Sequence, residues 1–566
     1  MSAPLLEICD LNIAFNGRPH PVHALRQFNL RIQPGESVGL VGESGSGKSV
    51  TALSIMRLLS KNDLHHENGI IRYSLPDGSP ITLNDLSESA LTRVRGKEIA
   101  MIFQEPMSSL NPVMRCGHQI TEAIRHHLKS SRTEAREQAL HLLEQVRLPD
   151  PARAYRAYPH ELSGGQKQRV MIAMALSCEP RLLLADEPTT ALDVTVQKGI
   201  LDLLQEIREA RQLALLFISH DLGVVRHITD RVSVLYRGEL QEEGDTAGIL
   251  RHPKAPYTRG LVACRPRIDV RYQRMPTLEV VLPDPEYQPL IIDPEASEIR
   301  RSGIYAQKPL LEVSGIHVRY PRKRNWFGAP VEWTDAVQNV SFELYPGECL
   351  GLAGESGCGK TTLGKAIARL TEVHQGQVLF RGENWLDMPE RALRRARRHL
   401  QVIFQDPYAA LNPRMPVGEA ISEPMRVHGL VSGASARRER VVELLEQVGL
   451  QADHYHRMPH AFSGGQRQRI CIARALALEP RLLICDEIVS ALDVSVQATI
   501  LNLLADLQGR LGLSFLFISH DLSVLHQVCD RLLVMKDGRL DAEGRPEVLF
   551  QSPPTPYVRS LLEAVL

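Results

Sequence analysis

The sequence predicts an α/β fold built from two tandem domains, each with a mainly parallel β-sheet. The glycine-rich segment GESGSGKS at residues 42–49 returns as GESGCGKT at residues 354–361, and four further motifs follow each copy in the same order. Short apolar runs such as SVGLVG, RLLLAD and LALLFIS precede polar residues in each half. Such runs are typical of strands that are buried on both faces of a parallel sheet. A repeat of this length indicates two whole domains.

The spacing between motifs supports the duplication. Ser163 and Glu187 are separated by as many residues as Ser463 and Glu487. The same holds from each glutamate to the histidine of FISHDL, His220 or His520. The first copy has eleven more residues than the second between the lysine of the glycine-rich segment and the glutamine of FQ(E/D)P. We therefore expect this difference to be confined to one surface region.

The domain boundaries follow from changes in composition. A chain of 566 residues is long enough for two to four domains. We expect a first domain at residues 1–263, a linker at 264–308 and a second domain at 309–566. Between Gln104 and Ser163 the charged, alanine- and leucine-rich pattern predicts a helical subdomain. The stretch 264–308 places six prolines among polar residues, which predicts a linker with little regular structure.

Composition excludes several classes of protein. Lys plus Arg equals Asp plus Glu at 66 each, so net charge gives no reason to expect binding to nucleic acid or to an anionic membrane surface. No run of about 18 apolar residues occurs, and the start of the chain lacks the pattern of a secretory signal. Nine cysteines without a CxxC pair are typical of reduced thiols. We expect a protein of the cytosolic compartment.

The glycine-rich segments predict phosphate binding. Glycines let successive backbone N–H groups and a helix N-terminus face a phosphate, and Lys48 or Lys360 adds a positive charge. Ser49 or Thr361 supplies a hydroxyl ligand for Mg²⁺. Each segment follows a strand-like apolar run, as a P-loop requires.

A pair of acidic residues ends another apolar run in each half, Asp186-Glu187 and Asp486-Glu487. The aspartate can hold Mg²⁺ and the glutamate can deprotonate a water that attacks the γ-phosphate. An acidic pair by itself is more often a surface turn. Its fixed distance from the SGGQ segment favours the catalytic interpretation.

Together these motifs resemble those of ABC transporter ATPases over nearly the whole chain. LSGGQ at residues 162–166 and FSGGQ at 462–466 resemble the family signature. The resemblance implies two ABC ATPase (P-loop NTPase) domains, each with a mainly parallel-sheet core, an antiparallel β subdomain and a helical subdomain. It also implies that the signature of one domain covers the γ-phosphate bound by the other. Lys48 would then act with Ser463, and Lys360 with Ser163.

The resemblance assigns roles to further residues. Gln104 and Gln405 resemble the Q-loop glutamine that contacts Mg²⁺ or water, and Asp193 and Asp493 resemble the D-loop aspartate. The implied catalytic residues are Glu187, Glu487, His220 and His520, and the implied Mg²⁺ ligands are Ser49, Gln104, Asp186, Thr361, Gln405 and Asp486. Phe15 and Tyr320 are the aromatic residues expected to stack on adenine, although a half-buried strand would use them equally well.

The residues expected to bind ATP form five groups: the first P-loop (Gly42, Glu43, Ser44, Gly45, Ser46, Gly47, Lys48, Ser49 and Val50), the second P-loop (Gly354, Glu355, Ser356, Gly357, Cys358, Gly359, Lys360, Thr361 and Thr362), the two signatures (Ser163, Gly164, Gly165 and Gln166; Ser463, Gly464, Gly465 and Gln466), the Q-loop pair (Gln104 and Gln405) and the adenine pair (Phe15 and Tyr320).

Two pairs of segments narrow the resemblance to one branch. FQEPMSSLNP and FQDPYAALNP, with HPKAPYT at 252–258 and SPPTPYV at 552–558, resemble the oligopeptide, dipeptide and nickel importer branch. The halves resemble its "D" and "F" subunits, fused as in microcin-type and glutathione-type peptide importers. The resemblance implies peptide import with two membrane permeases and an extracytoplasmic solute-binding protein, at the cytoplasmic face of the inner membrane. The alternatives are a nickel or metal-chelate importer and, more distantly, a soluble twin-ATPase translation factor.

Two residues of the second half stand out. Ile488 follows Glu487 where the first half has Pro188 and the family usually has proline, so the local turn could differ. Cys358 lies inside the second P-loop and raises the expectation of sensitivity to thiol reagents.

Overall fold

The computed structural model describes residues 3–17, 20–60, 62–104, 109–190, 192–284, 287–326 and 330–565. The chain forms two compact units. Unit 1 consists mainly of Met1–Ala263 and Leu278–Glu286, and unit 2 consists of Cys264–Thr277 and Tyr287–Val565. The predicted α/β fold with two tandem domains is confirmed.

Unit 1 contains two sheets. The larger has the strand order β10-β9-β3-β8-β7-β6, in which only β10 is antiparallel, and the smaller antiparallel sheet has the order β2-β1-β4-β5. The strands are β1 (Leu6–Phe15), β2 (Val22–Ile32), β3 (Ser37–Val41), β4 (Leu64–Ser74), β5 (Pro80–Thr82), β6 (Ile99–Ile102), β7 (Leu182–Asp186), β8 (Ala214–Ser219), β9 (Arg231–Tyr236) and β10 (Glu239–Asp245). β3, β7 and β8 are fully buried, as their apolar runs predict.

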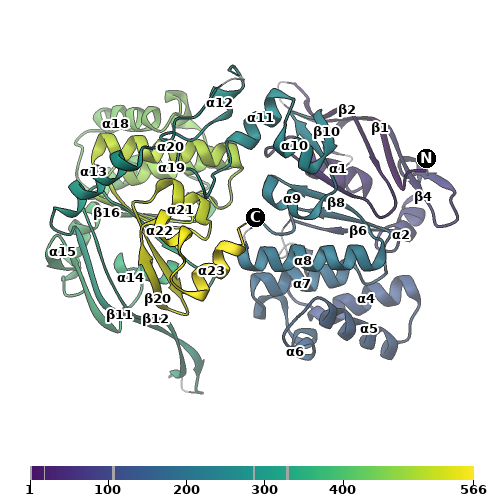
Figure 1. Cartoon of the computed structure of the whole chain (residues 1–566), viewed down its shortest axis with the longest axis horizontal. Coiled ribbons are helices and arrows are strands. Elements are labelled where there is room, and N and C mark those ends of the chain that lie inside the picture. Colours follow the sequence, from purple (N-terminus) through teal and green to yellow (C-terminus); the bar gives the residue numbers. More distant parts are fainter. Residues whose placement is uncertain are drawn as a thin grey trace. The chain divides into compact units, whose positions relative to one another are not determined.

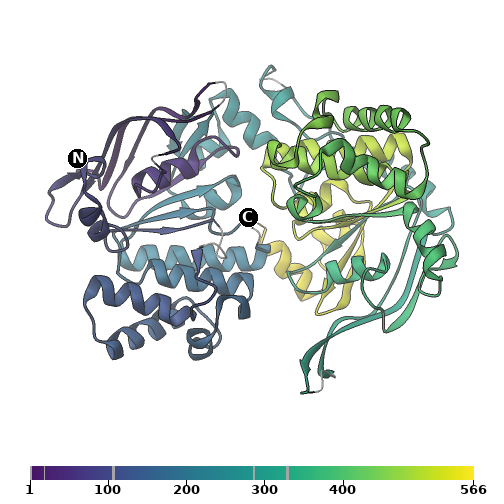
Figure 2. The same cartoon turned by 180° about the vertical axis from the view of Figure 1, so that it is seen from behind.

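The helices of unit 1 lie around these sheets. They are α1 (Lys48–Ile55), α2 (Glu88–Val94), α4 (Cys116–Leu128), α5 (Arg132–Gln145), α6 (Pro151–Arg156), α7 (Gly164–Ala175), α8 (Val194–Arg211), α9 (Leu222–Ile228), α10 (Thr246–Arg251), α11 (Pro256–Ala263) and α12 (Leu278–Val281). Figures 1 and 2 show α4 and α5 at one end of the unit and the antiparallel strands at the other. The helical subdomain predicted between Gln104 and Ser163 is therefore present.

Unit 2 repeats this architecture. Its sheets have the orders β16-β17-β18-β13-β19-β20 and β12-β11-β14-β15. The strands are β11 (Leu311–Arg324), β12 (Pro330–Leu344), β13 (Cys349–Ala353), β14 (Gln375–Phe380), β15 (Glu383–Asn384), β16 (Leu400–Ile403), β17 (Leu482–Asp486), β18 (Ser514–Ile518), β19 (Arg531–Lys536) and β20 (Arg539–Gly544). The helices are α13 (Pro294–Tyr305), α14 (Lys360–Ile367), α15 (Glu390–Ala396), α16 (Pro407–Ala410), α17 (Val417–His428), α18 (Ala434–Gln447), α19 (Gly464–Leu476), α20 (Val494–Leu511), α21 (Leu522–Val528), α22 (Pro546–Gln551) and α23 (Pro556–Glu563).

Most of the length difference between the halves lies in the antiparallel sheet. β4 has 11 residues where β14 has 6, and β5 has 3 where β15 has 2. The extra residues of the first half therefore lengthen one hairpin. The parallel sheet that carries the chemistry is unaffected.

The stretch 264–308 is more ordered than the sequence predicts. Asp293 caps α13 by accepting a hydrogen bond from the backbone N–H of Glu295, and Tyr272 and Ile291 form an isolated antiparallel bridge. Residues 264–277 and 287–308, here called the strap, belong to unit 2, whereas α12 packs against α11 in unit 1. Proline content misled the prediction because a proline at the start of a helix, here Pro294, favours the helix.

None of the described helices is long and apolar enough to cross a bilayer.

Candidate active site

Each P-loop joins the carboxyl end of a buried strand to a helix, β3 to α1 and β13 to α14. Gly47 has φ 107°, and a Cβ placed there would lie 2.4 Å from the carbonyl oxygen of Ala24. Gly359 has φ 106°, and its Cβ would lie 2.2 Å from the carbonyl oxygen of Ala336. Only glycine fits such a position, so the loop can curl with its N–H groups facing inward.

The P-loop lysines occupy equivalent positions. Lys48 Nζ donates to the carbonyl oxygens of Gly42 at 2.7 Å and Glu43 at 2.8 Å. Lys360 Nζ makes the same contacts at the same distances in the second loop. Both side chains are buried, which holds the ammonium group at the loop.

One polar atom of the first loop fits an incoming phosphate. Ser46 Oγ is buried and has no hydrogen-bond partner among the described residues. A phosphate oxygen in the loop would accept this hydrogen bond and would satisfy a group that is otherwise costly to bury. In unit 2 the equivalent residue is Cys358, whose Sγ lies 3.9 Å from Lys360 Nζ. The donor set of both loops therefore suits a nucleotide phosphate.

The residues expected to hold Mg²⁺ meet within each unit. Ser49 Oγ donates to Asp186 Oδ1 at 3.1 Å, and Thr361 Oγ1 donates to Asp486 Oδ1 at 2.9 Å. Burial raises the pKa of Asp186 to about 6, although the Ser49 hydrogen bond opposes this shift. Burial likewise raises the pKa of Asp486. A hydroxyl beside a buried carboxylate is a suitable oxygen pair for a hard divalent cation.

In unit 1 three side chains converge on the carboxylate of Glu187. Gln104 Nε2 donates to Oε2 at 2.9 Å, Thr190 Oγ1 donates to Oε2 at 3.0 Å, and His220 Nδ1 lies 3.1 Å from Oε1. Burial by itself raises the pKa of Glu187, but the contacts with His220, Lys48 and Thr190 outweigh burial and lower it to about 2. The carboxylate is therefore held ionised.

Unit 2 has the same arrangement with one change. Gln405 Nε2 donates to Glu487 Oε2 at 2.9 Å, and His520 Nδ1 lies 3.4 Å from the same oxygen. Ser490, at the position of Thr190, donates instead to the backbone carbonyl of Glu487 at 2.9 Å. Burial alone lowers the pKa of His520, but Glu487 more than offsets this effect, so the pKa is raised.

The backbone at the two glutamates is unusual and alike. Glu187 has φ 47° and Glu487 has φ 49°, both in the left-handed region that non-glycine residues rarely adopt. Each backbone N–H group donates to a carbonyl oxygen of the strand that precedes the histidine. The acceptors are Ile218 for Glu187 and Ile518 for Glu487, each at 3.0 Å. Ile488 is buried like Pro188 and leaves this geometry unchanged. The expected change in the local turn does not occur.

The signature serines lie at the exposed N-termini of two helices, α7 and α19, whose later residues are largely buried. Ser163 Oγ accepts from the N–H of Gln166 at 3.3 Å, while Gln166 Oε1 accepts from the N–H of Ser163 at 3.1 Å. Ser463 and Gln466 form the same reciprocal cap at the same distances. Both serines are exposed, so each helix N-terminus can meet an anion from outside.

The two aromatic candidates differ in their surroundings. Phe15 ends β1 and packs against the core beneath the antiparallel sheet. Tyr320 is 42% exposed, and its hydroxyl lies 3.2 Å from Thr371 Oγ1.

Part of the FQEPMSSLNP segment, at 105–108, lies outside the described residues.

Sequence reasoning missed one P-loop contact in each unit. The backbone N–H of Glu43 donates to the hydroxyl of Tyr257 at 3.1 Å, and that of Glu355 donates to Tyr557 at 3.1 Å. The tyrosines come from HPKAPYT and SPPTPYV, which the sequence analysis used only to identify a branch. The recurrence of Pro-Tyr at the end of both halves was the signal that could have found them.

Cys358 is unsuited to reaction with thiol reagents. The side chain is buried, and burial raises its pKa although Lys360 opposes the shift. Because the thiolate is the reactive form, the structure argues against the sensitivity expected from sequence.

Comparisons with known proteins agree with this geometry. The family model described as ABC transporter matches residues 25–190 and 337–490, and the model described as oligopeptide/dipeptide transporter, C-terminal region, matches residues 241–289. The second match contains Tyr257.

Related proteins span the whole chain. The glutathione import ATP-binding protein GsiA of Salmonella choleraesuis is 46% identical over 565 residues, covering 100% of this chain and 90% of the relative. Its namesake in Escherichia coli O6:H1 is 45% identical over 566 residues, covering 99% and 89%. A solved dimeric ATP-binding cassette in a post-hydrolysis state with ADP and Pi covers 42% of this chain and 98% of that chain, with 28% identity and a TM-score of 0.38. The chain therefore belongs to the ABC transporter family, and its two units are ATP-binding and ATP-hydrolysing cassettes.

Proposed function

We propose that this chain is the ATP-hydrolysing subunit that energises import of di- or oligopeptides, or of peptide-like compounds, through separate membrane permeases. The observation that carries the proposal is identity of 46% over the whole chain with a protein named for glutathione import. The match to the oligopeptide/dipeptide transporter region supports it independently.

Both cassettes have the groups that hydrolysis needs. Glu187 and Glu487 act as general bases toward the attacking water, and His220 and His520 orient the γ-phosphate and the base. The P-loop lysines stabilise charge on the β- and γ-phosphates. Mg²⁺ bound at Ser49–Asp186 and Thr361–Asp486 would polarise the phosphate oxygens, with Gln104 and Gln405 released from the glutamates to complete the site.

Each signature serine completes the site of the other cassette, Ser463 with Lys48 and Ser163 with Lys360. The exposed N-terminus of each signature helix supports this pairing, because a helix N-terminus attracts an anion. The residues between the cassettes keep the partner at a high effective concentration, so one chain suffices to form both sites. ATP-driven closure then acts on two permeases at the cytoplasmic face of the inner membrane, and an extracytoplasmic binding protein delivers the solute.

Purification of the tagged full chain from its native membranes tests the proposal. We expect two integral membrane permeases to co-purify, and peptides to stimulate ATP turnover after reconstitution with the binding protein. Recovery of ribosomes without permeases would overturn importer function. Stimulation by nickel chelates and not by peptides would replace the proposed substrate.

A further inference from the structure

Unit 2 holds the strap through residues that differ from those at the equivalent positions of unit 1. In unit 1, His227 Nε2 lies 2.7 Å from Asp202 Oδ1. The equivalent residues of unit 2 are Gln527 and Asn502, and both are buried. A histidine–aspartate contact within one cassette is thus replaced by two neutral amides.

Each amide binds one strap residue through two hydrogen bonds. Asn502 accepts from the N–H of Met275 at 2.8 Å and donates to its carbonyl oxygen at 2.9 Å. Gln527 accepts from the N–H of Tyr272 at 3.1 Å and donates to its carbonyl oxygen at 2.7 Å. Asn and Gln can do this because each has a donor and an acceptor, whereas a carboxylate only accepts.

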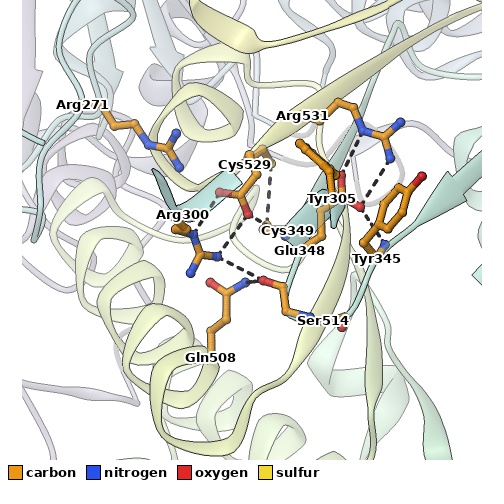
Figure 3. A network of polar contacts seen from close by, with 12 residues as sticks. Arg271, Arg300, Tyr305, Tyr345, Glu348, Cys349, Gln508, Ser514, Cys529 and Arg531 are labelled. Carbon is orange, nitrogen blue, oxygen red and sulfur yellow. Dashed lines mark hydrogen bonds and ion pairs between the residues drawn. The ribbon is translucent and has the colours of Figure 1, made fainter. Parts of the chain in front are cut away.

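At a third position, too, unit 2 bonds to the strap where unit 1 bonds within its own cassette. Asp230 of unit 1 accepts from Arg208 of its own cassette at 2.8 Å. In unit 2 the arginine is replaced by Gln508, and Asp530 instead accepts from Arg300 of the strap at 3.2 and 3.1 Å. Figure 3 shows Arg300 beside Gln508, near Cys349. The strap therefore supplies the cation that the second cassette lacks.

A cavity of about 330 Å³ lies between the strap and the second cassette. A cavity of about 150 Å³ already accommodates benzene, and ligand pockets begin near 300 Å³. Much of the wall is apolar and comes from Met275, Ile292, Leu501, Leu504, Phe515 and Phe517. The wall also includes Arg271 and Arg300, which Figure 3 shows on the same side of Cys529.

The charges around this wall favour an anion. Among the described residues, Arg300 pairs with Asp530, while three linked arginines (Arg271, Arg301 and Arg545) share two carboxylates (Glu547 and Glu298). Of these, Arg271 lies on the cavity wall: it contacts Glu547 at 3.5 Å, a carboxylate that Arg301 also contacts, and its Nε donates to the carbonyl oxygen of Gln527 at 3.2 Å. An anionic group beside Arg271 would balance the remaining positive charge.

The cavity also lies behind the catalytic loops of the second cassette. Leu501–Gly509 of its lining belong to the second half of α20, which begins at the D-loop residue Asp493. Gln527 and Val528 end α21, which begins two residues after His520. Cys349 starts β13, which leads into the P-loop. An occupant would thus contact the far ends of three elements that carry catalytic residues.

We propose that this cavity is an effector site for a small carboxylate with an apolar body, and that it acts on the second cassette. The carboxylate binds Arg271, and the body fills the space lined by Met275, Phe515 and Phe517. The described residues of unit 1 include no segment equivalent to the strap, so we place the effect at the site of Lys360.

Binding is tested on the purified full chain by calorimetry with 4-phenylbutyrate and with its neutral analogue 4-phenylbutanol. We expect 4-phenylbutyrate to bind at least tenfold more tightly than the alcohol, and Arg271→Met to remove this preference. Ala505→Leu, which fills the cavity, should abolish binding of both. The control is Arg267→Met, because Arg267 is a strap arginine that pairs with the exposed Asp269 outside the cavity, and it should change nothing. Absence of 4-phenylbutyrate binding, or equal binding by the Arg271 or Ala505 variant, would overturn the site.

The effector role is tested by linkage, because ATP must change the affinity for the probe by the same factor as the probe changes the affinity for ATP. We measure 4-phenylbutyrate affinity with and without ATP in the full chain carrying Glu187→Gln and Glu487→Gln, so that ATP persists. We expect at least a twofold difference that Lys360→Ala removes and Lys48→Ala retains. Equal affinities with and without ATP would overturn the effector role. A difference in affinity that only Lys48→Ala removes would show that the cavity acts on the first cassette, which contradicts the proposal.

Discussion

Gln104 donates a hydrogen bond of 2.9 Å to the carboxylate of Glu187, and Gln405 makes the same bond of 2.9 Å to Glu487. In unit 1 the contacts with His220, Lys48 and Thr190 outweigh burial and lower the pKa of Glu187 to about 2, so its carboxylate is ionised. A carboxylate with so low a pKa is a weak base. We therefore expect ATP binding to withdraw the histidine, which returns basicity to the glutamate when the water is in place.

Removing both bases should separate binding from hydrolysis. In the chain with Glu187→Gln and Glu487→Gln, we expect phosphate release to fall by about 10²–10⁴-fold, the usual contribution of a general base. ATP affinity should stay within about threefold, since the P-loops are intact. Phosphate-release kinetics and equilibrium binding of a fluorescent ATP analogue measure the two quantities. Normal hydrolysis in the double variant would show that other residues act as bases.

The pairing of Lys48 with Ser463 predicts a non-additive pair of substitutions. Lys48→Ala combined with Ser463→Ala should lose little more ATP turnover than either change alone, because both remove the same site. The matched control is Lys48→Ala with Ser163→Ala, which damages both sites and should lose nearly all turnover. Steady-state ATPase rates are measured for the three single variants and the two double variants. The reverse pattern would place each signature with the P-loop of its own cassette.

The two tyrosines whose hydroxyls accept hydrogen bonds from the P-loops should increase the affinity for ATP. Tyr557→Phe removes the acceptor for the N–H of Glu355 and leaves the ring in place. A single hydrogen bond contributes about 0.5–1.5 kcal/mol, so we expect ATP affinity at the second site to fall by about two- to tenfold. Tyr257→Phe should do the same at the first site. Titration of each variant in a background with the other P-loop lysine changed to alanine measures the effect, and unchanged affinity would make the contact incidental.

Sequence alone predicted the fold and named most of the residues that meet at the candidate site, because both depend on local patterns. A P-loop is a run of glycines before a lysine, and the acidic pair ends an apolar strand, so each can be read within a few residues. The contacts of Tyr257 and of the strap join residues far apart in the chain. The strap also uses backbone groups of Tyr272 and Met275, which leave no trace in composition. In the sequence, the contacts of the strap are indicated only by the replacement of Asp202 and His227 with Asn502 and Gln527 at the equivalent positions.

The residue after the second glutamate should be neutral for catalysis. Glu487 has φ 49° with Ile488 next to it, and Glu187 has φ 47° with Pro188 next to it. We therefore expect Ile488→Pro to change turnover by less than about twofold, since a buried side chain of similar bulk is exchanged without moving the carboxylate. The control is Pro188→Ile in the first cassette. ATPase rates in a Lys48→Ala background isolate the second site, and a loss above tenfold would contradict the structural equivalence of the two turns.

The strap should be released by giving unit 2 the residues of unit 1. In the chain with Asn502→Asp and Gln527→His, the new pair can bond to itself as Asp202 and His227 do, which leaves the backbone of Tyr272 and Met275 without partners. Each lost buried partner costs about 1–3 kcal/mol. We expect amide hydrogen exchange in residues 264–277 to rise at least tenfold while α20 stays protected. The reverse substitutions in unit 1, Asp202→Asn with His227→Gln, should leave amide hydrogen exchange in the strap unchanged. Equal protection in the unit 2 variant would show that the apolar contacts of the strap suffice to hold it, because its side chains Met275 and Tyr272 are themselves buried.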